Sequence, residues 1–301
     1  MYGPADERES VATIHAAQER GVTLFDTGDF YGMGHNELLL GRALAGHRGR
    51  ALLSVKFGAL RDPDGGWLGF DGRPAAVKSF LAHTLTRLGV DHVDVYRPAR
   101  LDPAVPIEET VGAIAELVKA GYVRHVGLSE VGAETARRAQ SVQPICDLQI
   151  EYSLVSRGPE KKIFPALREL GVGVTAYGVL CRGLLSGTRP GAQGDSRARM
   201  PRFSAENLEK NLAAARALGA LAAERGVTAT QLAIAWALSK DAAVVPVVGA
   251  RTRRQLDEAL GALELELGPD EIARLEAALP PDAFAGERYD PNQLRRLDSE
   301  R

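Results

Sequence analysis

The sequence predicts an α/β protein, a (β/α)8 TIM barrel, on three observations. Short apolar segments alternate with helical patterns along nearly the whole chain of 301 residues, which is typical of a parallel sheet covered by helices. A doubly wound sheet fits this alternation as well. However, residues 32–37 lack the third glycine of a dinucleotide-binding fingerprint, and no P-loop occurs. The candidate polar residues follow the ends of several different strands, where barrel enzymes place their active sites.

Apolar runs predict the strands, and the periodic segments between them predict the helices. The predicted strands are 23–25, 52–55, 93–96, 125–128, 148–151, 172–176 and 244–248. The predicted helices are 9–20, 36–44, 74–88, 107–120, 133–140, 160–170, 208–225, 230–238, 253–260 and 269–279. Gly21 stops the first helix and Pro74 opens the third. Residues 58–72, rich in Gly and Asp, are predicted to be an exposed loop, and residues 178–206 are predicted to be a long loop too rich in Gly, Arg and Pro to be regular.

The strand count is seven where a barrel needs eight. The chain begins with a helix, so we expect the first strand to be missing at the N-terminus, with residues 2–5 as its only possible remnant. No linker interrupts the alternation. We therefore expect one domain over residues 1–301, with a polar C-terminal tail from about residue 280.

The composition of the chain argues against several classes of function. A hydrophobic content of 45% suffices for a large core, and a net charge of −2 gives no basic footprint for nucleic acid or anionic membrane. No apolar run reaches the roughly 18 residues of a membrane span. The N-terminus lacks a secretory signal, so we expect a cytoplasmic protein. The two cysteines and six histidines show no disulfide or metal spacing, and no metal is expected.

Three polar residues at neighbouring strand ends form a candidate acid site. Asp26 ends the first strand, Tyr31 lies in the loop after it, and Lys56 ends the second strand. A phenol, with a reference pKa of about 10, is a poor acid at pH 7, but a nearby ammonium stabilises its phenolate. A carboxylate beside the lysine keeps that lysine charged. Each residue alone also fits a structural role, in a loop cap, in the core or at the surface; their joint placement favours chemistry.

Another candidate site follows the last strand. Gly249, Arg251 and Thr252 lead into a helix, and a helix N-terminus with an arginine and a hydroxyl suits an anion. The alternative is a solvated basic helix start, with Arg251, Arg253 and Arg254 simply exposed.

Several segments, taken in order, resemble the aldo-keto reductase superfamily over nearly the whole chain. They are residues 25–32 (FDTGDFYG), 54–56 (SVK), 127–129 (GLS), 148–153 (LQIEYS), 177–187 (YGVLCRGLLSG) and 246–251 (PVVGAR). The resemblance implies a (β/α)8 barrel that reduces aldehydes or ketones to alcohols with NADPH and no Rossmann domain. It implies that Tyr31 protonates the carbonyl oxygen as hydride arrives from the nicotinamide, with Lys56 and Asp26 tuning it.

The resemblance also implies a set of cofactor-binding residues. Ser129 and Gln149 match positions that hold the nicotinamide carboxamide, and Tyr177 matches the aromatic that stacks on the nicotinamide. Without the family, these three would equally suit local backbone bonding or core packing. The remaining implied contacts are Gly183, Leu184 and Ser186 at the pyrophosphate, and Gly249, Arg251, Thr252 and Gln255 at the 2′-phosphate.

Three departures from the family pattern stand out. Ala99 occupies the place of the usual catalytic histidine, so the triad must suffice, or Arg100 or a water substitutes; a pyridoxal-reductase-like subset shares this change. Glu130 replaces an asparagine and can accept from the carboxamide but not donate to it. Ala259 replaces the asparagine that reads adenine. A nucleotide-binding regulatory or redox-sensing barrel, or an inactive truncated member, therefore stays open beside the enzyme.

Two further expectations concern the loops. Trp67 and Phe70 lie in the first Gly-rich stretch, where they could touch the carbonyl substrate. Arg197, Arg199 and Arg202 lie in the second stretch and are expected to form a solvated face, the alternative being that they close over the cofactor.

Overall fold

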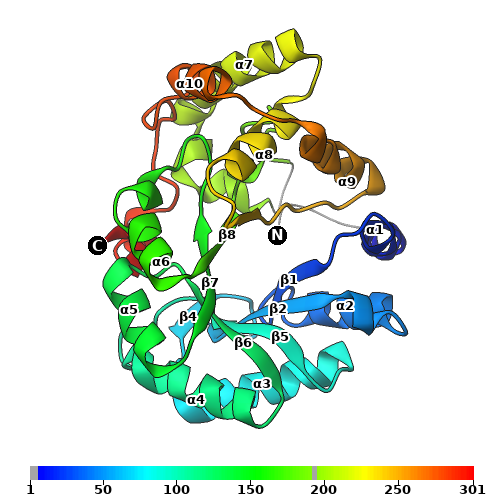
Figure 1. Cartoon of the computed structure of the whole chain (residues 1–301), viewed down its shortest axis with the longest axis vertical. Helices are drawn as coiled ribbons and strands as arrows, with labels where there is room; N and C mark the ends of the chain where they lie inside the picture. The colour runs from blue at the N-terminus through cyan, green and yellow to red at the C-terminus, as the bar shows by residue number, and fades with distance from the viewer. Residues whose placement is uncertain (1–5, 192–194) are drawn as a thin grey trace. The chain divides into compact units, whose positions relative to one another are not determined.

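The computed structural model describes residues 6–191 and 195–301 (Figure 1). The chain divides into two compact units. The first unit comprises Asp6–Gln149, Lys162–Gly173 and Leu297–Arg301, and the second comprises the described residues of Ile150–Lys161 and Val174–Arg296. The chain's last residues therefore return to the unit in which its first helix lies. The expectation of a single domain over residues 1–301 stays a prediction.

The first unit alternates strands and helices. Its strands are β1 (Leu24–Gly28), β2 (Leu52–Phe57), β3 (Ala59–Arg61), β4 (Trp67–Phe70), β5 (Val93–Pro98), β6 (Val123–Ser129) and β7 (Ile145–Glu151), the last two residues of β7 belonging to the second unit. Its helices are α1 (Glu7–Glu19), α2 (His35–Leu44), α3 (Pro74–Leu88), α4 (Ile107–Lys119), α5 (Ala133–Val142) and α6 (Ile163–Leu170). Parallel pairing runs in the order β1-β2-β5-β6-β7, so strands adjacent in this order follow one another along the chain apart from the β3–β4 hairpin.

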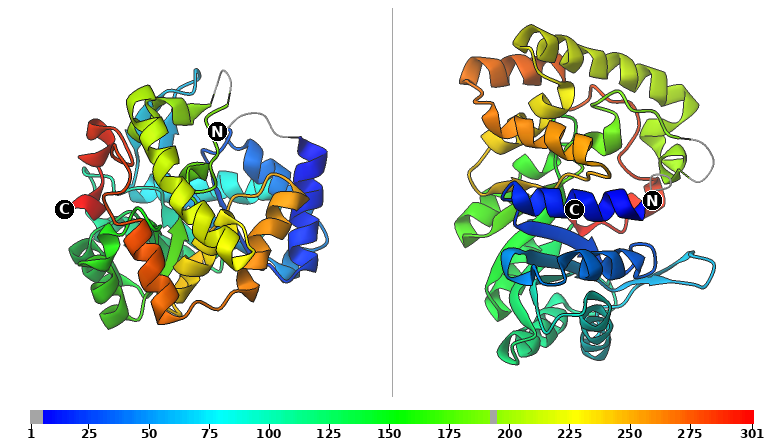
Figure 2. Two further views of the ribbon diagram at one scale, coloured as in Figure 1. Left: turned by 90° about the horizontal axis from the view of Figure 1, so that it is seen from above. Right: turned by 90° about the vertical axis from the view of Figure 1, so that its right-hand side faces the viewer.

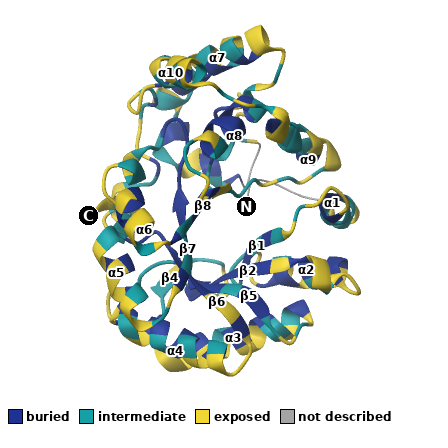
Figure 3. Ribbon diagram, in the orientation of Figure 1, coloured by how far each residue is buried: buried dark blue, intermediate teal, exposed yellow. Residues whose placement is uncertain are grey.

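The two faces of these strands have different chemistry. Val55 and Phe57 of β2 are completely buried (Figure 3). Tyr96 of β5 donates its hydroxyl to the carbonyl of Val77 on α3, so it faces the helices. Because successive side chains of a strand point to opposite faces, Lys56 and Arg97 lie on the other, polar face of the sheet.

The second unit contains most of the C-terminal half of the chain. Its elements are β8 (Gly173–Tyr177, from Val174 on), η3 (Cys181–Gly183), η4 (Ser196–Arg199), η5 (Pro201–Phe203), α7 (Ala205–Arg225), α8 (Ala229–Ser239), β9 (Val244–Pro246), α9 (Arg253–Leu260), α10 (Pro269–Ala278) and α11 (Pro291–Leu294). β8 and β9 pair in parallel, and α7 packs against α8 and α10 (Figure 2). The indole of Trp236, fully buried on α8, stacks on the ring of Tyr152 at 5.1 Å.

The predicted alternation is confirmed over the described residues, because each of the seven predicted strands and ten predicted helices forms there. The prediction for residues 2–5 lies outside the described residues.

The prediction of an exposed loop over residues 58–72 is wrong in part, because strands form within this stretch and its two ends are buried. This stretch contains the antiparallel hairpin β3–β4, which projects from the first unit (Figure 2). The carboxylate of Asp62 accepts a hydrogen bond from the backbone N–H of Gly66 at 2.6 Å and closes the turn. The Arg61 guanidinium lies 3.6 Å from the centre of the Trp67 ring. These side-chain contacts stabilise a hairpin that the Gly-rich composition concealed.

The solvated arginine face is also wrong for two of its three members. Arg197 and Arg202 are buried, whereas Arg199 is exposed. Arg197 pairs with Asp195 at 2.6 Å, and Arg202 donates to the carbonyl of Val155 at 3.0 Å. The arginines therefore hold loops together, because backbone carbonyls and a carboxylate replace water as their partners.

Candidate active site

A buried polar cluster lies where β1 and β2 run side by side. Their register places Asp26 opposite Ser54, and Gly28 opposite Lys56. Lys56 forms an ion pair with one carboxylate oxygen of Asp26. The other oxygen accepts hydrogen bonds from the Ser54 hydroxyl and from the Gln149 amide, each at 2.8 Å. The side chains of Asp26 and Lys56 are only 8% and 4% exposed.

The surroundings keep Asp26 ionised. Burial by itself would raise the pKa of this carboxyl group. The positive charges of Lys56 and Arg97, together with hydrogen bonds from Lys56 and Gln149, outweigh that effect and hold the pKa below its usual range.

Tyr31 lies beside this pair. The Lys56 ammonium is 5.1 Å from the centre of the Tyr31 ring. The loop that carries Tyr31 is fastened to the end of β2, because the backbone N–H of Asp29 donates to the Lys56 carbonyl at 2.9 Å and the Asp29 carboxyl accepts from the Gly58 N–H at 3.2 Å. The structure therefore brings together the three residues that the sequence analysis placed in the candidate acid site.

Asp29 was missed from the sequence. Burial, with a smaller contribution from the charge of Glu37, raises the pKa of this carboxyl group to about 7 against the opposing effects of hydrogen bonds from Gly58 and Phe30 and of the Arg87 charge. Its Oδ1 atom is buried and has no hydrogen-bond partner. The only signal in the sequence was a second aspartate in the Tyr31 loop.

The ends of β5 and β6 supply further candidates. Ser129 is buried, and its hydroxyl is 3.4 Å from the guanidinium of Arg100. The same Arg100 nitrogen donates to the carbonyl of Ala99 at 2.6 Å. Arg100 is thus held at the strand end where Ala99 stands in place of a histidine.

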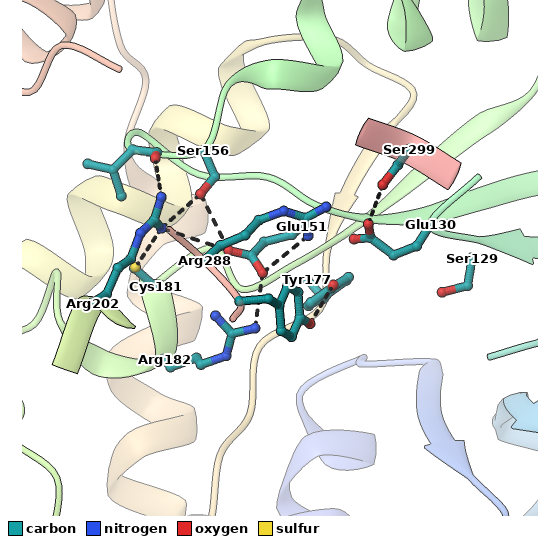
Figure 4. A network of polar contacts seen from close by, with 12 residues as sticks. Ser129, Glu130, Glu151, Ser156, Tyr177, Cys181, Arg182, Arg202, Arg288 and Ser299 are labelled. Atoms are coloured by element: carbon teal, nitrogen blue, oxygen red, sulfur yellow. Dashed lines mark hydrogen bonds and ion pairs between the residues drawn. The ribbon is translucent and has the colours of Figure 1, made fainter. Parts of the chain in front are cut away.

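Glu130 has a role that the sequence did not show. Its carboxylate accepts a hydrogen bond from the Ser299 hydroxyl at 2.6 Å (Figure 4), and its carbonyl accepts from the Ser299 N–H at 3.2 Å. Glu130 adopts a positive φ of 54°. It therefore anchors the C-terminal residues to the end of β6, and its contact with a cofactor stays a prediction.

The hairpin carries an aromatic cluster next to Tyr31. The rings of Phe30 and Tyr31 meet edge to face at 4.8 Å, Phe30 lies 5.9 Å from Trp67, and Trp67 lies 6.1 Å from Phe70. Trp67 is 50% exposed. The cluster offers an apolar surface beside the candidate acid.

In the second unit, one buried carboxylate organises several arginines. Glu151 lies within 3.1 Å of Arg182, 3.5 Å of Arg288 and 3.9 Å of Arg202 (Figure 4). The hydroxyl of Tyr177, at the end of β8, lies 3.0 Å from that of Tyr289.

Arg288 and Tyr289 belong to the segment predicted to be a polar tail, and no motif in the sequence indicated a role for them. This segment also contains the short helix α11, so it is partly regular.

The loop after β8 forms a tight turn. Gly183 has a φ of 95°, its carbonyl accepts from the Ser186 hydroxyl at 3.0 Å and from the Thr188 N–H at 2.8 Å, and Leu184 is fully buried. A Cβ on Gly183 would lie 3.0 Å from the Thr188 side chain. The turn is therefore held by its own hydrogen bonds.

The helix start after β9 has the expected form. Thr252 caps α9 by accepting from the Gln255 N–H at 3.2 Å, and the Gln255 side chain accepts from the Arg251 N–H at 2.9 Å. The first turn of α9 contains no acidic residue. Gly249 and Arg251 are exposed on the approach to this helix. The positive end of the helix dipole and the arginines therefore act in the same direction.

The residues that the structure describes include neither a candidate metal site nor a candidate membrane-spanning helix. Residues 6–191 and 195–301 contain no group of three side chains arranged to hold a metal ion. No helix in the same ranges is long and apolar enough to cross a membrane.

Comparison with known proteins gives a consistent result. The model of the aldo/keto reductase family matches residues 1–280. A Glycine max protein described as probable aldo-keto reductase 1 is 39% identical over 292 residues, which is 95% of this chain and 84% of that protein.

Solved structures are similar as well. A glycerol dehydrogenase from Gluconobacter oxydans superposes with a TM-score of 0.83 at 32% identity, covering 93% of this chain and 89% of the other. The holo form of an aldo-keto reductase from Bacillus halodurans gives a TM-score of 0.77 at 27% identity, with 93% and 90% covered. The predicted fold class and the resemblance noted from the sequence are confirmed.

Proposed function

Because the chain belongs to the aldo-keto reductase family, we propose that it reduces aldehydes or ketones to alcohols with NADPH and that Tyr31 is its general acid. Family membership itself implies an oxidoreductase that uses a nicotinamide cofactor on small carbonyl compounds. The observation that carries the finer proposal is the buried Asp26–Lys56 ion pair beside the Tyr31 ring.

The three residues divide the work of proton transfer. The nicotinamide, when bound, supplies the hydride to the carbonyl carbon. The Tyr31 hydroxyl gives its proton to the carbonyl oxygen, and the Lys56 ammonium stabilises the phenolate that remains. Asp26 holds the Lys56 side chain in place through their buried ion pair.

No histidine takes part in this scheme. The methyl group of Ala99 cannot donate a hydrogen bond to the substrate oxygen. We assign the proton transfer to the triad alone, with Arg100 as the nearest side chain at that strand end that can donate to a substrate oxygen.

The residues present fit a phosphorylated nicotinamide cofactor. The basic, capped start of α9 supports a 2′-phosphate at Arg251, Thr252 and Gln255, with Gly249 allowing close approach. A pyrophosphate contact is proposed at the turn of Gly183, Leu184 and Ser186 on the family resemblance, although the N–H groups of Gly183 and Leu184 already donate to the carbonyls of Leu180 and Cys181. This combination favours NADPH over NADH.

Four residues are proposed to contact the nicotinamide end of the cofactor. Ser129 and Gln149 would bind the carboxamide, and Glu130 would accept from its N–H groups. The Gln149 amide has two N–H donors, one of which already serves Asp26. Tyr177 would stack on the ring. A cytoplasmic location belongs to the same proposal.

A regulatory or redox-sensing barrel that binds the nucleotide without turnover is the alternative function, and an inactive member is the third. The intact Asp26, Tyr31 and Lys56 cluster favours the enzyme, whereas Ala99 is the observation that favours either alternative.

The test combines binding and turnover. NADPH is titrated by fluorescence, and its oxidation is then followed with a panel of carbonyl compounds that includes pyridoxal and aryl aldehydes. We expect turnover in the unchanged chain and a loss of at least about 100-fold in Tyr31→Phe with binding preserved.

The matched control is Tyr122→Phe, which removes an exposed hydroxyl of the first unit. Binding without turnover on every carbonyl would favour the regulatory alternative. Equal turnover by Tyr31→Phe and the unchanged chain would show that Tyr31 is not the acid.

A further inference from the structure

We propose that Arg97 is a positioning residue, a buried cation that keeps Asp26 ionised and directed at Lys56 by acting through Ser54. This inference rests on the proposed function, since it concerns the same cluster. The motif comparison assigned no role to Arg97. It lies on β5, opposite Lys56 in the strand register, and it is completely buried.

A continuous chain of contacts links Arg97 to the candidate catalytic pair. The Arg97 guanidinium donates to the Ser54 hydroxyl oxygen at 2.9 Å. That hydroxyl donates to the Asp26 carboxylate at 2.8 Å, and the other oxygen of the same carboxylate pairs with Lys56. Because the Ser54 oxygen accepts from Arg97, its O–H is directed away from the guanidinium and toward Asp26.

A glycine on the neighbouring strand leaves the space that the Arg97 side chain occupies. Arg97 also forms an ion pair with Asp147 on β7, at 2.9 Å. The strand β6 lies between β5 and β7, and Gly127 is the β6 residue at the crossing. A Cβ on Gly127 would lie 2.7 Å from the Asp147 carboxylate and 3.1 Å from the Arg97 guanidinium. Any larger residue at this position would therefore collide with the ion pair.

Charges alternate along the cluster. Lys56, Asp26, Arg97 and Asp147 are positive, negative, positive and negative in turn, and each is next to its opposite. Around Asp26, β2 contributes Lys56, β5 contributes Arg97, β7 contributes Asp147 and the neutral Gln149, and the loop after β1 contributes Tyr31. The Cys146 thiol donates to Asp147 at 3.3 Å.

Stability alone does not explain such a pair. Burying two charges costs desolvation energy that their attraction often fails to exceed, and well-packed apolar replacements are frequently as stable or more so. The contact that apolar residues could not reproduce is the one through Ser54 to Asp26. Arg97 therefore serves the charge state of the cluster.

The primary test measures Asp26 directly, without turnover. Aspartate side chains are labelled with ¹³C at the carboxyl carbon, and the Asp26 resonance is identified by its absence in Asp26→Asn. In the unchanged chain we expect it to titrate below the ordinary range of aspartate. In Arg97→Met it should titrate at least about one pH unit higher, and Arg97→Lys should recover part of the shift.

Two more variants separate charge from folding. Asp147→Asn keeps Arg97 but removes its other counterion, so Asp26 should titrate no higher than in the unchanged chain. The double variant Arg97→Gln with Asp147→Asn retains polar contacts and removes both charges, so it should show the upward shift even if Arg97→Met folds poorly.

Arg48→Met is the control, because it breaks a comparable ion pair, Arg48 with Asp94 at 2.7 Å, that has no contact with Asp26. An unchanged Asp26 titration in both Arg97→Met and the double variant, or an equal shift in Arg48→Met, would overturn the proposal.

The pH profile of kcat/KM connects the inference to the reaction. Its acid limb should move upward with the Asp26 resonance in Arg97→Met and stay in place in Arg48→Met. A shifted resonance in a chain that reduces no carbonyl would support the role of Arg97 while contradicting the proposed function, so the two failures are distinguishable.

Discussion

The candidate catalytic cluster and the start of α9 hold their charges in opposite ways. In the first unit, Asp26 and Lys56 are almost wholly buried and already paired. In the second, Arg251 is exposed, and the polar contacts around it are those of an ordinary helix cap. Buried, paired charges are oriented before any ligand arrives, which is what proton transfer needs. An exposed charge is in contact with water, so an anion that binds there must displace that water first.

The comparison also shows where each site is vulnerable. A change to one member of the buried cluster leaves its partners unsatisfied in a place that water reaches poorly. A change at the helix start removes one contact and leaves the rest solvated. The expected effects below decrease in that order.

The largest effect is expected from Lys56→Met. This change removes the cation that stabilises the Tyr31 phenolate and leaves Asp26 without its main partner, so kcat/KM for carbonyl reduction should fall about 10²–10⁴-fold. Steady-state kinetics with NADPH measures it. Lys240→Met, which breaks an ion pair with Glu276 in the second unit, is the control. Similar losses in both variants would mean that the loss is a general effect of removing a paired cation.

Arg251→Ala should affect the cofactor and not the chemistry. A charge-assisted hydrogen bond to a phosphate contributes roughly 1.5–3 kcal/mol, so the dissociation constant for NADPH should rise about 10–100-fold while that for NADH stays constant. Fluorescence titration with both cofactors measures the difference. Arg274→Ala, at an exposed pair with Glu224, should change neither. If both cofactors weakened equally, the 2′-phosphate would not lie at Arg251.

Asp29→Asn should change the pH dependence of stability. The carboxyl group has a pKa of about 7 when folded against 3.8 ordinarily. The folded state therefore holds the proton more tightly, and stability falls as pH rises from about 4 to 7 and is constant above 7. The variant should lack this fall, on the order of 1–3 kcal/mol, because an amide does not ionise.

Denaturant unfolding at pH 5 and pH 8 measures that difference. Asp64→Asn, at an exposed position in the hairpin turn, should follow the unchanged chain. A parallel pH dependence in Asp29→Asn would show that the carboxyl group ionises as readily folded as unfolded.

The smallest effect is expected from Thr252→Ala, which removes the cap of α9 and should cost about 1 kcal/mol of stability. Because Thr252 is also proposed to touch the phosphate, NADPH binding should weaken severalfold. Thr228→Ala removes the equivalent cap of α8 and should cost as much stability without weakening NADPH. Equal binding losses in the two variants would assign the effect to helix stability.

Much of the fold follows from local sequence patterns. The apolar runs that end in Asp26 and Lys56 form β1 and β2, and the helix that Pro74 opens ends at Leu88 as predicted. Asp26, Tyr31 and Lys56 come together because parallel strands bring their carboxyl ends to one edge. These features depend on the spacing of apolar residues and on the order of the strands along the chain, and both can be read from short stretches of sequence.

Other features were decided by tertiary structure alone. The contact between Glu130 and Ser299 joins residues 169 positions apart, and neither has a local pattern that names the other. Gly127 reads as an ordinary strand glycine until Arg97 and Asp147 are seen to meet over it. Arg202 reads as a surface residue until its carbonyl partner at Val155 is known.

The physical reason is the separation along the sequence of the residues that interact. Whether a segment becomes a strand or a helix depends mainly on its own side chains, so the sequence by itself determined the elements, their order and the three candidate catalytic residues. Which buried polar group partners which depends on where distant strands leave space, so only the tertiary structure decided that Arg97 supports Asp26, that Glu130 binds the chain end and that residues 59–70 form a hairpin.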